Sequence, residues 1–297
     1  GAGTSFLIAA LDDVHPLIQR TAIHGLGVQR AVMARDLVAV FTKEGMPIEL
    51  RREAIITLGQ MRSLDSLPTL IGITQGEDIG LQLAAVAAIA EIPGLEVDAA
   101  LGNLFPAYAG TPVEGSFMRS LMVRGSAAAR LVLRPYLMGA DSHLSQRAAV
   151  LGGALGDPIA APVLMDWLPQ DTRNPELLGA LANSLCVDFR STPDPAGTYQ
   201  AWWLDNQSRT SAEWLRNAAA DSGFNIPSGF DDPTKVDPKQ TVAALLGVLE
   251  GGPAHMRAVT CYFLNTLTGV DTAVIAIGTP SAELKRRAQP WHDWLNS

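Results

Sequence analysis

Apolar residues recur along the chain at helical spacing, in short segments that start with a polar residue and end with Leu-Gly or a similar small pair. The clearest copies read QRTAIHGLG from Gln19 and RREAIITLG from Arg51. Alanines inside the copies keep a regular distance, with Ala22 and Ala54 32 residues apart and Ala54 and Ala85 31 apart. A helical pattern with a fixed period near 32 predicts an α-solenoid, a fold of stacked helical hairpins. Weaker copies begin at Leu83, Phe117, Gln146, Leu177 and Met256.

The first hairpin shows how the individual helices are predicted. Thr4 or Ser5 is expected to be the N-cap of a helix with the sequence FLIAALDD. Pro16 fits the first turn of the second helix, PLIQRTAIHGLG, which Gly25 and Gly27 are expected to end. The same alternation predicts helices over residues 35–45, 48–61, 66–76, 77–92, 95–108, 127–142, 143–157, 161–170 and 174–185, with Gly125 weakening the second helix of the fourth hairpin.

The segment LIAALDDVHPLIQRTAIHGLG, residues 7–27, resembles a bacterial HEAT-like repeat, in which an apolar helix, an Asp-rich turn with Pro and an Arg-bearing helix follow one another. The resemblance implies an all-α fold, a right-handed α-solenoid of HEAT-like helical hairpins over residues 1–185. It also implies a ladder of Asp and Arg side chains that pair between adjacent repeats. The matching residues are Asp12 or Asp13 with Arg20, and Arg51 or Arg52 in the next repeat.

The pattern changes after Leu185. The segment that follows is polar and rich in turn formers, and Pro193, Pro195 and Gly197 argue against a long regular helix there. It resembles an extension of bacterial HEAT-like proteins, notably from planctomycetes and myxobacteria, in which a Leu-Thr-Gly-x-Asp-Phe motif and a Pro-containing loop precede a Trp-bearing helix. The matching residues are Leu185, Asp188, Phe189, Pro195, Trp202, Trp203 and Trp214, with Cys186-Val187 in place of Thr-Gly.

The end of the chain repeats this extension. Leu267-Thr268-Gly269 is intact there, and a segment PWHDWLNS follows in the position of the Trp-bearing helix. Between the two copies, residues 223–238 are rich in helix breakers and predict a loop. We therefore expect residues 186–297 to form C-terminal helical repeats with Trp-bearing extensions and a loop insertion near residues 223–238.

Charge and length narrow the classes of partner. The net charge is −8, and only four of the 22 basic residues are lysines, without a basic run. This distribution argues against nucleic-acid binding and favours protein partners with basic or mixed surfaces. No run of 18 apolar residues exists, so no transmembrane helix is predicted. The sequence opens with GAGTS instead of Met, as in a processed or truncated chain, and both cytoplasm and periplasm stay open as its compartment.

No motif points to a catalytic, cofactor or metal site. The five histidines form neither HxxxH, HxH nor HExxH, and no serine lies in a GxSxG motif. The glycine-rich LGGALGD from Leu151 does not match a phosphate-binding loop. Cys186 and Cys261 lack the spacing of metal ligands, and two buried free thiols are favoured over a disulfide. We therefore expect no catalytic residues, no cofactor and no bound metal.

The tryptophans all lie in the second half of the chain, and they provide the candidate interaction residues. Trp291 and Trp294 are three residues apart, so they share a helix face, and we expect them to be buried. Trp202 and Trp203 are adjacent and cannot point the same way from a helix. One of them is therefore expected to be exposed, which makes Trp202 and Trp203 the candidate protein-interaction residues.

The resemblance to HEAT-like proteins implies three functions of different classes. The first is a non-enzymatic protein-binding scaffold or adaptor, acting alone or as a subunit of a larger bacterial assembly. The alternative is a bilin-lyase-like protein or another enzyme accessory protein, because some HEAT-like proteins take part in bilin attachment. A third is a DNA glycosylase, a family that uses HEAT-like repeats with a basic concave face, for which the acidic composition gives little support.

Overall fold

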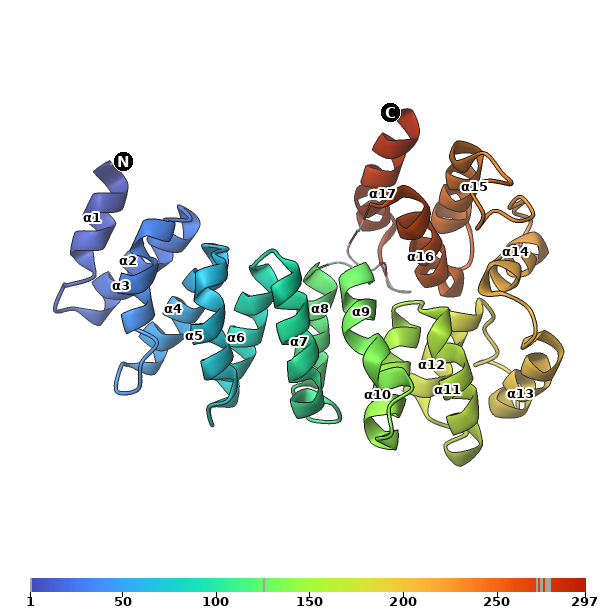
Figure 1. Ribbon diagram of the computed structural model, residues 1–297, viewed down its shortest axis with the longest axis horizontal. Coiled ribbons are helices and arrows are strands. Elements are labelled where there is room, and N and C mark those ends of the chain that lie inside the picture. Colours follow the sequence, from blue (N-terminus) through green and yellow to red (C-terminus); the bar gives the residue numbers. More distant parts are fainter. Residues whose placement is uncertain (1, 125, 271, 273–274, 276–278) are drawn as a thin grey trace. The chain divides into compact units, whose positions relative to one another are not determined.

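A computed structural model shows a chain that is helical wherever it has regular secondary structure, throughout residues 2–124, 126–270, 272, 275 and 279–297, which are those the structure describes (Figure 1). The helices divide into two compact units, unit 1 from Gly1 to Arg124 and unit 2 from Gly125 to Ser297. The change of sequence pattern at residue 185 therefore lies inside unit 2. The expected weakening at Gly125 lies outside the described residues. None of the described helices is both long enough and apolar enough to span a membrane.

Unit 1 consists of helices that pair into hairpins, and the hairpins stack as an α-solenoid. The second helices of successive hairpins pack side by side, α2 on α4, α4 on α6 and α6 on α8. The first helices, such as α5, pack against their own partners. The elements are α1 (Ala2–Ala10), α2 (Pro16–Val28), α3 (Arg35–Val40), α4 (Ile48–Gln60), α5 (Leu67–Thr74), α6 (Ile79–Glu91), α7 (Leu95–Tyr108) and α8 (Glu114–Arg124), with short 3₁₀ turns at Val32–Ala34 and Leu64–Ser66.

The alanines that set the period form the core of the stack. Ala22, Ala54 and Ala85 are all buried, each at the centre of a second helix. A small side chain there allows neighbouring helix axes to come close while Ile and Leu fill the space on either side. The spacing in the sequence thus corresponds to one repeat of the solenoid, as predicted.

The predicted helix ends are wrong at several places. Thr4 and Ser5 lie within α1, and the Thr4 hydroxyl bonds to the side chain of Gln29 at 2.8 Å and does not cap the helix. Gly25 and Gly27 lie within α2 and do not end it. A glycine in a sequence can end a helix or permit a close helix contact, and the pattern alone does not distinguish the two.

A residue with positive φ instead follows each of the second helices α2, α4 and α6. Arg30 and Arg62 have φ values of 49° and 55°, and Gly94 has 126°, at intervals of 32 residues. The backbone N–H of Arg30 donates to Gly27 O and that of Arg62 donates to Gly59 O, both at 2.9 Å. A left-handed residue after a helix satisfies its last carbonyls in this way. The repeat therefore ends three residues beyond the Leu-Gly pair.

The glycines of the Leu-Gly pairs allow adjacent second helices to touch. A Cβ added to Gly59 would lie 2.6 Å from the Cα of Ala88 on α6, and one added to Gly27 would lie 2.2 Å from the side-chain oxygen of Gln60 on α4. In unit 2, a Cβ on Gly153 would lie 2.9 Å from the Cβ of Ala180. The small ending of the repeat is thus a packing requirement between repeats.

This contact gives a first prediction. Gly59→Ala is expected to lower the free energy of unfolding by about 1–3 kcal/mol, because the added methyl group meets the α6 backbone. Gly72→Ala is the matched control, since Gly72 lies in α5 with open space around it, and there alanine should raise stability by up to about 1 kcal/mol. Urea unfolding followed by circular dichroism measures both, and a Gly59→Ala variant as stable as Gly72→Ala would contradict the close contact.

Unit 2 continues the same architecture. The helix α10 packs on α9 and α12, α12 packs on α16, and α15 packs on α16 and α17. Side-chain caps begin several of its helices, with Asp141 before α10 and Asn174 before α12. The elements are α9 (Ser126–Leu137), α10 (Ser142–Ala154), α11 (Ala161–Trp167), α12 (Pro175–Leu185), α13 (Pro195–Asn206), α14 (Ser211–Asp221), α15 (Pro238–Gly251), α16 (Arg257–Thr268) and α17 (Ser281–Asn296), with 3₁₀ turns at Pro158–Ala160, Leu168–Gln170 and Ala254–Met256.

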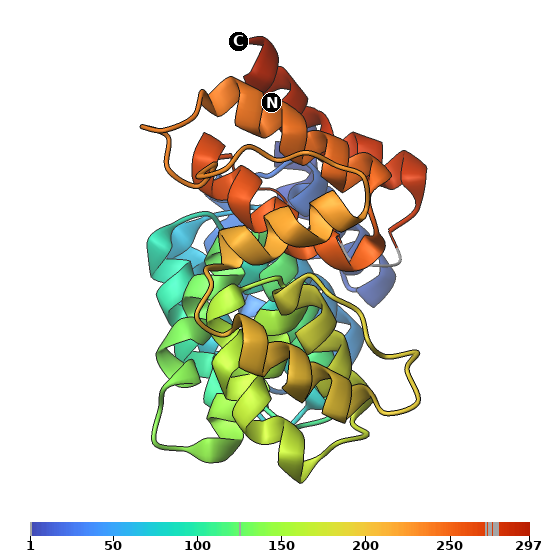
Figure 2. The ribbon, with the colours of Figure 1, turned by 90° about the vertical axis from the view of Figure 1, so that its right-hand side faces the viewer.

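The sequence predicts a loop near residues 223–238, and the segment between α14 and α15 is non-helical (Figure 2). It packs into the core of unit 2 through two apolar side chains. Ile226 and Phe230 are buried in the core, and the Phe230 ring lies 4.9 Å from the Phe263 ring on α16. The loop therefore belongs to the packed core of unit 2.

Ion pairs connect neighbouring repeats, but with partners other than those predicted. Arg20 on α2 pairs with Glu53 on α4 at 3.3 Å, and Arg147 on α10 pairs with Glu176 on α12 at 2.9 Å. In the turn between α1 and α2, the Asp13 carboxylate accepts a hydrogen bond from the backbone N–H of His15. The expected pairing of Asp12 or Asp13 with Arg20 is therefore wrong, because the acid that reaches Arg20 lies on the next second helix.

Candidate functional site

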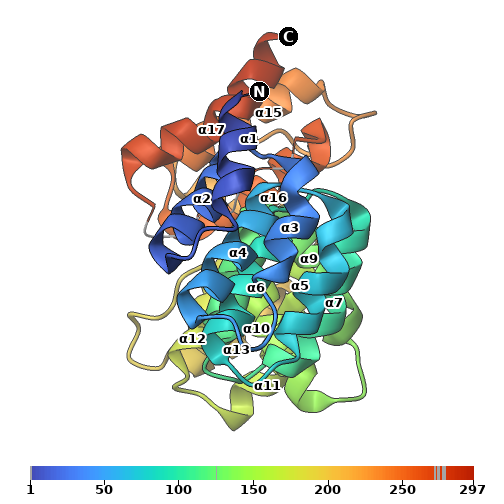
Figure 3. The same ribbon diagram turned by 90° about the vertical axis from the view of Figure 1, so that its left-hand side faces the viewer.

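A groove lies along the second helices of unit 1, between α4, α6 and α8, and has a volume of about 510 Å³. The helix α6 forms its floor and packs against α4 on one side and α8 on the other, and α4 and α6 are labelled in Figure 3. The residues that line the groove lie between Arg52 and Ser120 in the sequence, and all of them belong to unit 1. The stacking of three successive repeats is what brings these residues together.

The floor of the groove is made of small residues. Gly80, Ala84, Ala87 and Ala88 line it, and their spacing places them along one face of α6. The same helix has larger side chains on its buried face, such as Ile89. Because its outward face has almost no side-chain bulk, the taller side chains of α4 and α8 rise above it, and the surface is hollow there.

The walls combine apolar surface with arginines. Ile56 on α4 is 38 % exposed, and Leu83 borders the floor from α6. Arg52 on α4 and Arg119 on α8 are exposed residues on opposite walls, and Arg119 Nη2 donates to the Ser116 hydroxyl at 2.6 Å. The groove is therefore an apolar hollow between two guanidinium groups.

An acid lies at one end of the groove. Glu91 is the last residue of α6, and its backbone carbonyl accepts a bond from Arg62 Nε at 3.0 Å. Arg52 lies in the first half of α4, and α4 and α6 run in the same direction, because Gly59 near the end of α4 contacts Ala88 near the end of α6. Among the charged residues of the groove lining, Arg52 and Glu91 thus lie towards different ends.

The chemistry of the groove suits binding. Its lining contains no histidine, cysteine, lysine or tyrosine among the described residues. The Ser120 hydroxyl donates to the Ser116 backbone carbonyl at 3.1 Å, and the Ser116 hydroxyl accepts from Arg119. Neither serine is next to a general base, which a catalytic serine needs for activation. We see in the groove a surface that can hold an apolar side chain between charged groups.

The structure places Trp202 and Trp203 differently from the expectation. Both are half-buried, and their ring centres lie 5.9 and 5.7 Å from that of Trp214 on α14. The Trp214 indole N–H donates to the Asn206 carbonyl at 2.9 Å. The prediction that one of the pair is exposed is wrong, because α14 folds back and places Trp214 against both rings. The exposed apolar residue at this place is Leu204, with 71 % of its surface accessible.

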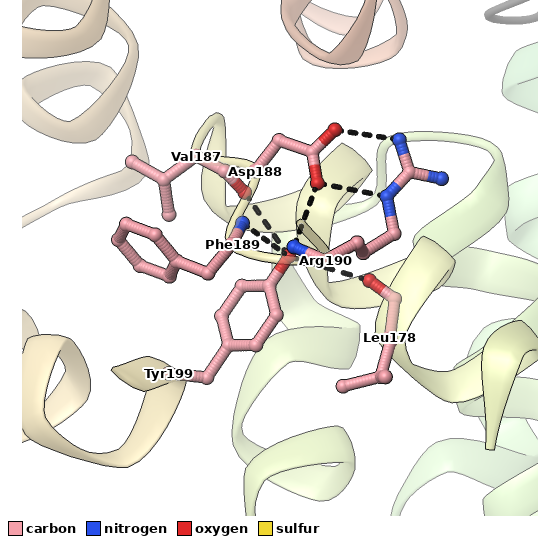
Figure 4. Close-up of polar contacts among 6 residues, drawn as sticks. All are labelled: Leu178, Val187, Asp188, Phe189, Arg190 and Tyr199. Carbon is pink, nitrogen blue, oxygen red and sulfur yellow. Dashed lines mark hydrogen bonds and ion pairs between the residues drawn. The ribbon is translucent and has the colours of Figure 1, made fainter. Parts of the chain in front are cut away.

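A second residue of α13, Tyr199, fixes the segment that precedes the tryptophans (Figure 4). Its hydroxyl lies 3.3 Å from the Val187 carbonyl and 3.4 Å from the Leu178 carbonyl, and it accepts a bond from the Phe189 N–H at 3.3 Å. Its ring is fully buried, and burial raises the pKa of its hydroxyl. Tyr199 is therefore a neutral structural group. It was not predicted from the sequence, in which its only signal is its position one helical turn before Trp202 and Trp203.

An ion pair closes the same turn. Asp188 accepts bonds from Arg190 Nε at 2.8 Å and Arg190 Nη2 at 2.6 Å, and the Arg190 guanidinium holds the pKa of the Asp188 carboxyl below its usual value (Figure 4). The helix α13 then starts at Pro195 and includes Gly197, whose backbone N–H donates to the capping Asp194. Pro195 and Gly197 thus belong to a regular helix of 12 residues, and the expectation that they argue against one is wrong, because Pro195 fits the first turn.

The correspondence between the two copies of the extension needs one correction. Cys186 follows α12 with φ of 60°, and Gly269 follows α16 with φ of 70°. Cys186 therefore occupies the place of Gly269, and Leu185 the place of Thr268, so the earlier pairing of Cys186-Val187 with Thr-Gly is shifted by one residue. The resemblance to the extension of bacterial HEAT-like proteins stays a prediction.

Both cysteines are buried free thiols in the structure. Burial raises the pKa of Cys186 and raises that of Cys261 to about 12, so both are protonated at neutral pH. Within the described part of the chain, no group of three or more His, Cys, Asp or Glu side chains is arranged to hold a metal ion.

Comparison with known families identifies part of the chain. Residues 4–90 match the family of HEAT repeats. The matched segment includes α4 and all of α6 but its last residue, so it supplies two of the three helices that line the groove, and α8 follows it. No curated protein matches the chain in sequence.

The solved structures that match the chain include two distant ones. The complex of CpcE and CpcF of phycocyanin lyase from Nostoc sp. PCC7120 is 19% identical, with 89% of this chain and 94% of that chain covered and a TM-score of 0.38. Human deoxyhypusine hydroxylase in complex with glycerol is 20% identical, with 73% and 83% covered and a TM-score of 0.29. With TM-scores this low, neither similarity bears on the activity of this chain.

Proposed function

We propose that the chain is a non-enzymatic protein-binding scaffold or adaptor, and that the groove between α4, α6 and α8 is its binding surface. The observation that supports this most directly is an apolar hollow of about 510 Å³, open to solvent and with short side chains on its floor. Stacked helical repeats present continuous surfaces that bind other proteins. A side chain of a partner that enters the hollow would cover Ile56 and Leu83, which are partly exposed in the isolated chain.

The groove is favoured over the tryptophans as the main contact. Trp202 and Trp203 pack on Trp214, so most of their apolar surface is already used inside unit 2. We retain them as proposed protein-interaction residues only together with exposed Leu204, which extends their surface outwards.

A photo-crosslinking experiment tests the groove as a binding surface. A photoreactive amino acid replaces Ala87, an exposed residue of the floor, and the full chain is crosslinked in an extract of its source organism. We expect one defined protein to be attached at this position. The same amino acid at Ala243, an exposed alanine of α15 in unit 2, is the matched control and should not give that product.

Binding is then measured with the purified partner. Ala87→Trp fills the groove and is expected to weaken binding at least about tenfold, while Ala243→Trp leaves it unchanged. Both variants should unfold at the same temperature as the parent chain, since both substituted positions are exposed. A partner that binds the Ala87→Trp variant as tightly as the parent, or the absence of any product at position 87, would overturn the proposal.

A further inference from the structure

The charge of the groove is opposite to that of the whole chain. The net charge is −8, whereas the described lining of the groove contains two arginines, Arg52 and Arg119, and one acid, Glu91. A partner chosen by the net charge alone would carry basic groups. A partner that enters the groove first meets the two guanidinium groups, so the local charge decides what is accepted.

The two arginines are placed to receive carboxylates. Arg52 lies on α4, while the adjacent Arg51 turns away, with its Nε donating to the Thr42 carbonyl at 3.2 Å. Arg119 uses Nη2 on the Ser116 hydroxyl, and its guanidinium has further N–H donors. A guanidinium matches the two oxygens of a carboxylate, and such charge-assisted bonds are stronger than bonds between neutral groups.

The shape of the floor adds a second requirement. Gly80, Ala84 and Ala87 present almost no side-chain bulk, so the backbone or a bulky apolar side chain of a partner can approach α6 closely. Because the arginines stand on the opposite walls α4 and α8, acidic groups must lie on either side of that apolar side chain. This is the pattern of an amphipathic segment with one apolar residue between acidic ones.

We propose that the groove binds an acidic amphipathic segment of a partner protein, with an apolar side chain over Ala84 and Ala87 and carboxylates on Arg52 and Arg119. This inference rests on the proposed function, which places the binding surface in the groove.

Selection from a library of random linear peptides displayed on phage tests this proposal. The intact chain is immobilised, and bound phages are eluted with an excess of the soluble parent chain. We expect the selected peptides to be enriched in Asp and Glu around a Leu, Ile or Phe. The peptides should bind the Arg52→Glu/Arg119→Glu variant roughly tenfold more weakly or worse, and their binding to the parent should weaken as salt is added.

The outcomes separate the two proposals. Peptides enriched in Lys and Arg that lose binding to the Ala87→Trp variant would overturn the acidic partner and leave the groove as the binding surface. Peptides that bind Ala87→Trp and the parent equally would overturn both. Failure to select any peptide would overturn the acidic linear segment, while the crosslinking at Ala87 still tests the groove itself. Equal melting temperatures of the parent and the charge-reversed variant, whose substituted residues are both exposed, confirm that the fold is retained.

Discussion

Trp291→Ala is expected to lower the free energy of unfolding of unit 2 by about 3–5 kcal/mol. The Trp291 side chain is 0 % exposed and belongs to the core formed by α14 to α17, with Leu284 and Ala288 of its own helix and Leu245 of α15 in the same cluster. Removing the indole leaves a cavity that the surrounding helices fill only in part, so the lost burial and the cavity both contribute. Urea unfolding, followed by far-ultraviolet circular dichroism, measures the change without depending on tryptophan fluorescence.

Trp294→Ala is the matched control for this prediction. Trp294 lies on the same helix and is only half-buried, so its removal should cost roughly 1–2 kcal/mol, since less apolar surface is lost. Trp291→Phe should also cost less than Trp291→Ala. The buried Trp291 indole nitrogen has no hydrogen-bond partner among the described residues, so phenylalanine sacrifices packing volume alone. Equal losses for the two alanine variants would show that Trp291 is not the residue that packs α17 on the core.

The architecture of this chain could be predicted from the sequence because its period reflects packing. Ala22, Ala54 and Ala85 are buried at the centre of successive second helices, and a residue that must stay small in each repeat gives a regular signal. The helix ends could not be predicted in the same way. Gly27 lies inside a helix because its missing side chain makes room for Gln60 of the next one, a reason that only the three-dimensional contact shows.

The groove was not predicted, although its residues are plain in the sequence. It depends on Arg52, Ala87 and Arg119, which lie on three different helices and come together only when the repeats stack. The available signal was a face of small residues on α6, from Gly80 through Ala87, in a helix that also has Leu81, Val86 and Ile89 among its buried residues. The tryptophan prediction was wrong for a similar reason, because Trp214 covers the pair from the next helix.

Gly156→Ala is expected to lower the free energy of unfolding of unit 2 by about 2–5 kcal/mol. Gly156 has φ of 72°, and the N–H groups of Gly156 and Asp157 donate to the Gly153 and Gly152 carbonyls, both at 2.9 Å. These two bonds form the left-handed helix end in which glycine avoids a steric cost. In addition, a Cβ at this position would lie 2.3 Å from the Ala258 carbonyl carbon, where the backbone has to shift.

A shift of this turn would also affect the charges beside it. Asp157, the next residue, is 1 % exposed, and its carboxylate binds Arg134 Nε at 2.9 Å and Arg134 Nη2 at 3.3 Å. A buried carboxylate that loses its partner is strongly unfavourable. The loss of stability in Gly156→Ala should therefore be accompanied by faster hydrogen exchange in both α9 and α10, which mass spectrometry resolves.

The variant Gly269→Ala separates the cost of the left-handed backbone from the cost of the steric contact at Gly156. Gly269 has nearly the same φ, 70°, but no atom of the described residues lies within 4 Å of an added Cβ, so alanine there should cost only about 1–2 kcal/mol. The excess cost at Gly156 then measures the contact of the turn after α10 with the start of α16. Similar losses of stability at both glycines would mean that the backbone near Ala258 shifts at little energetic cost. The turn after α10 and the start of α16 would then be less firmly packed than their close contact indicates.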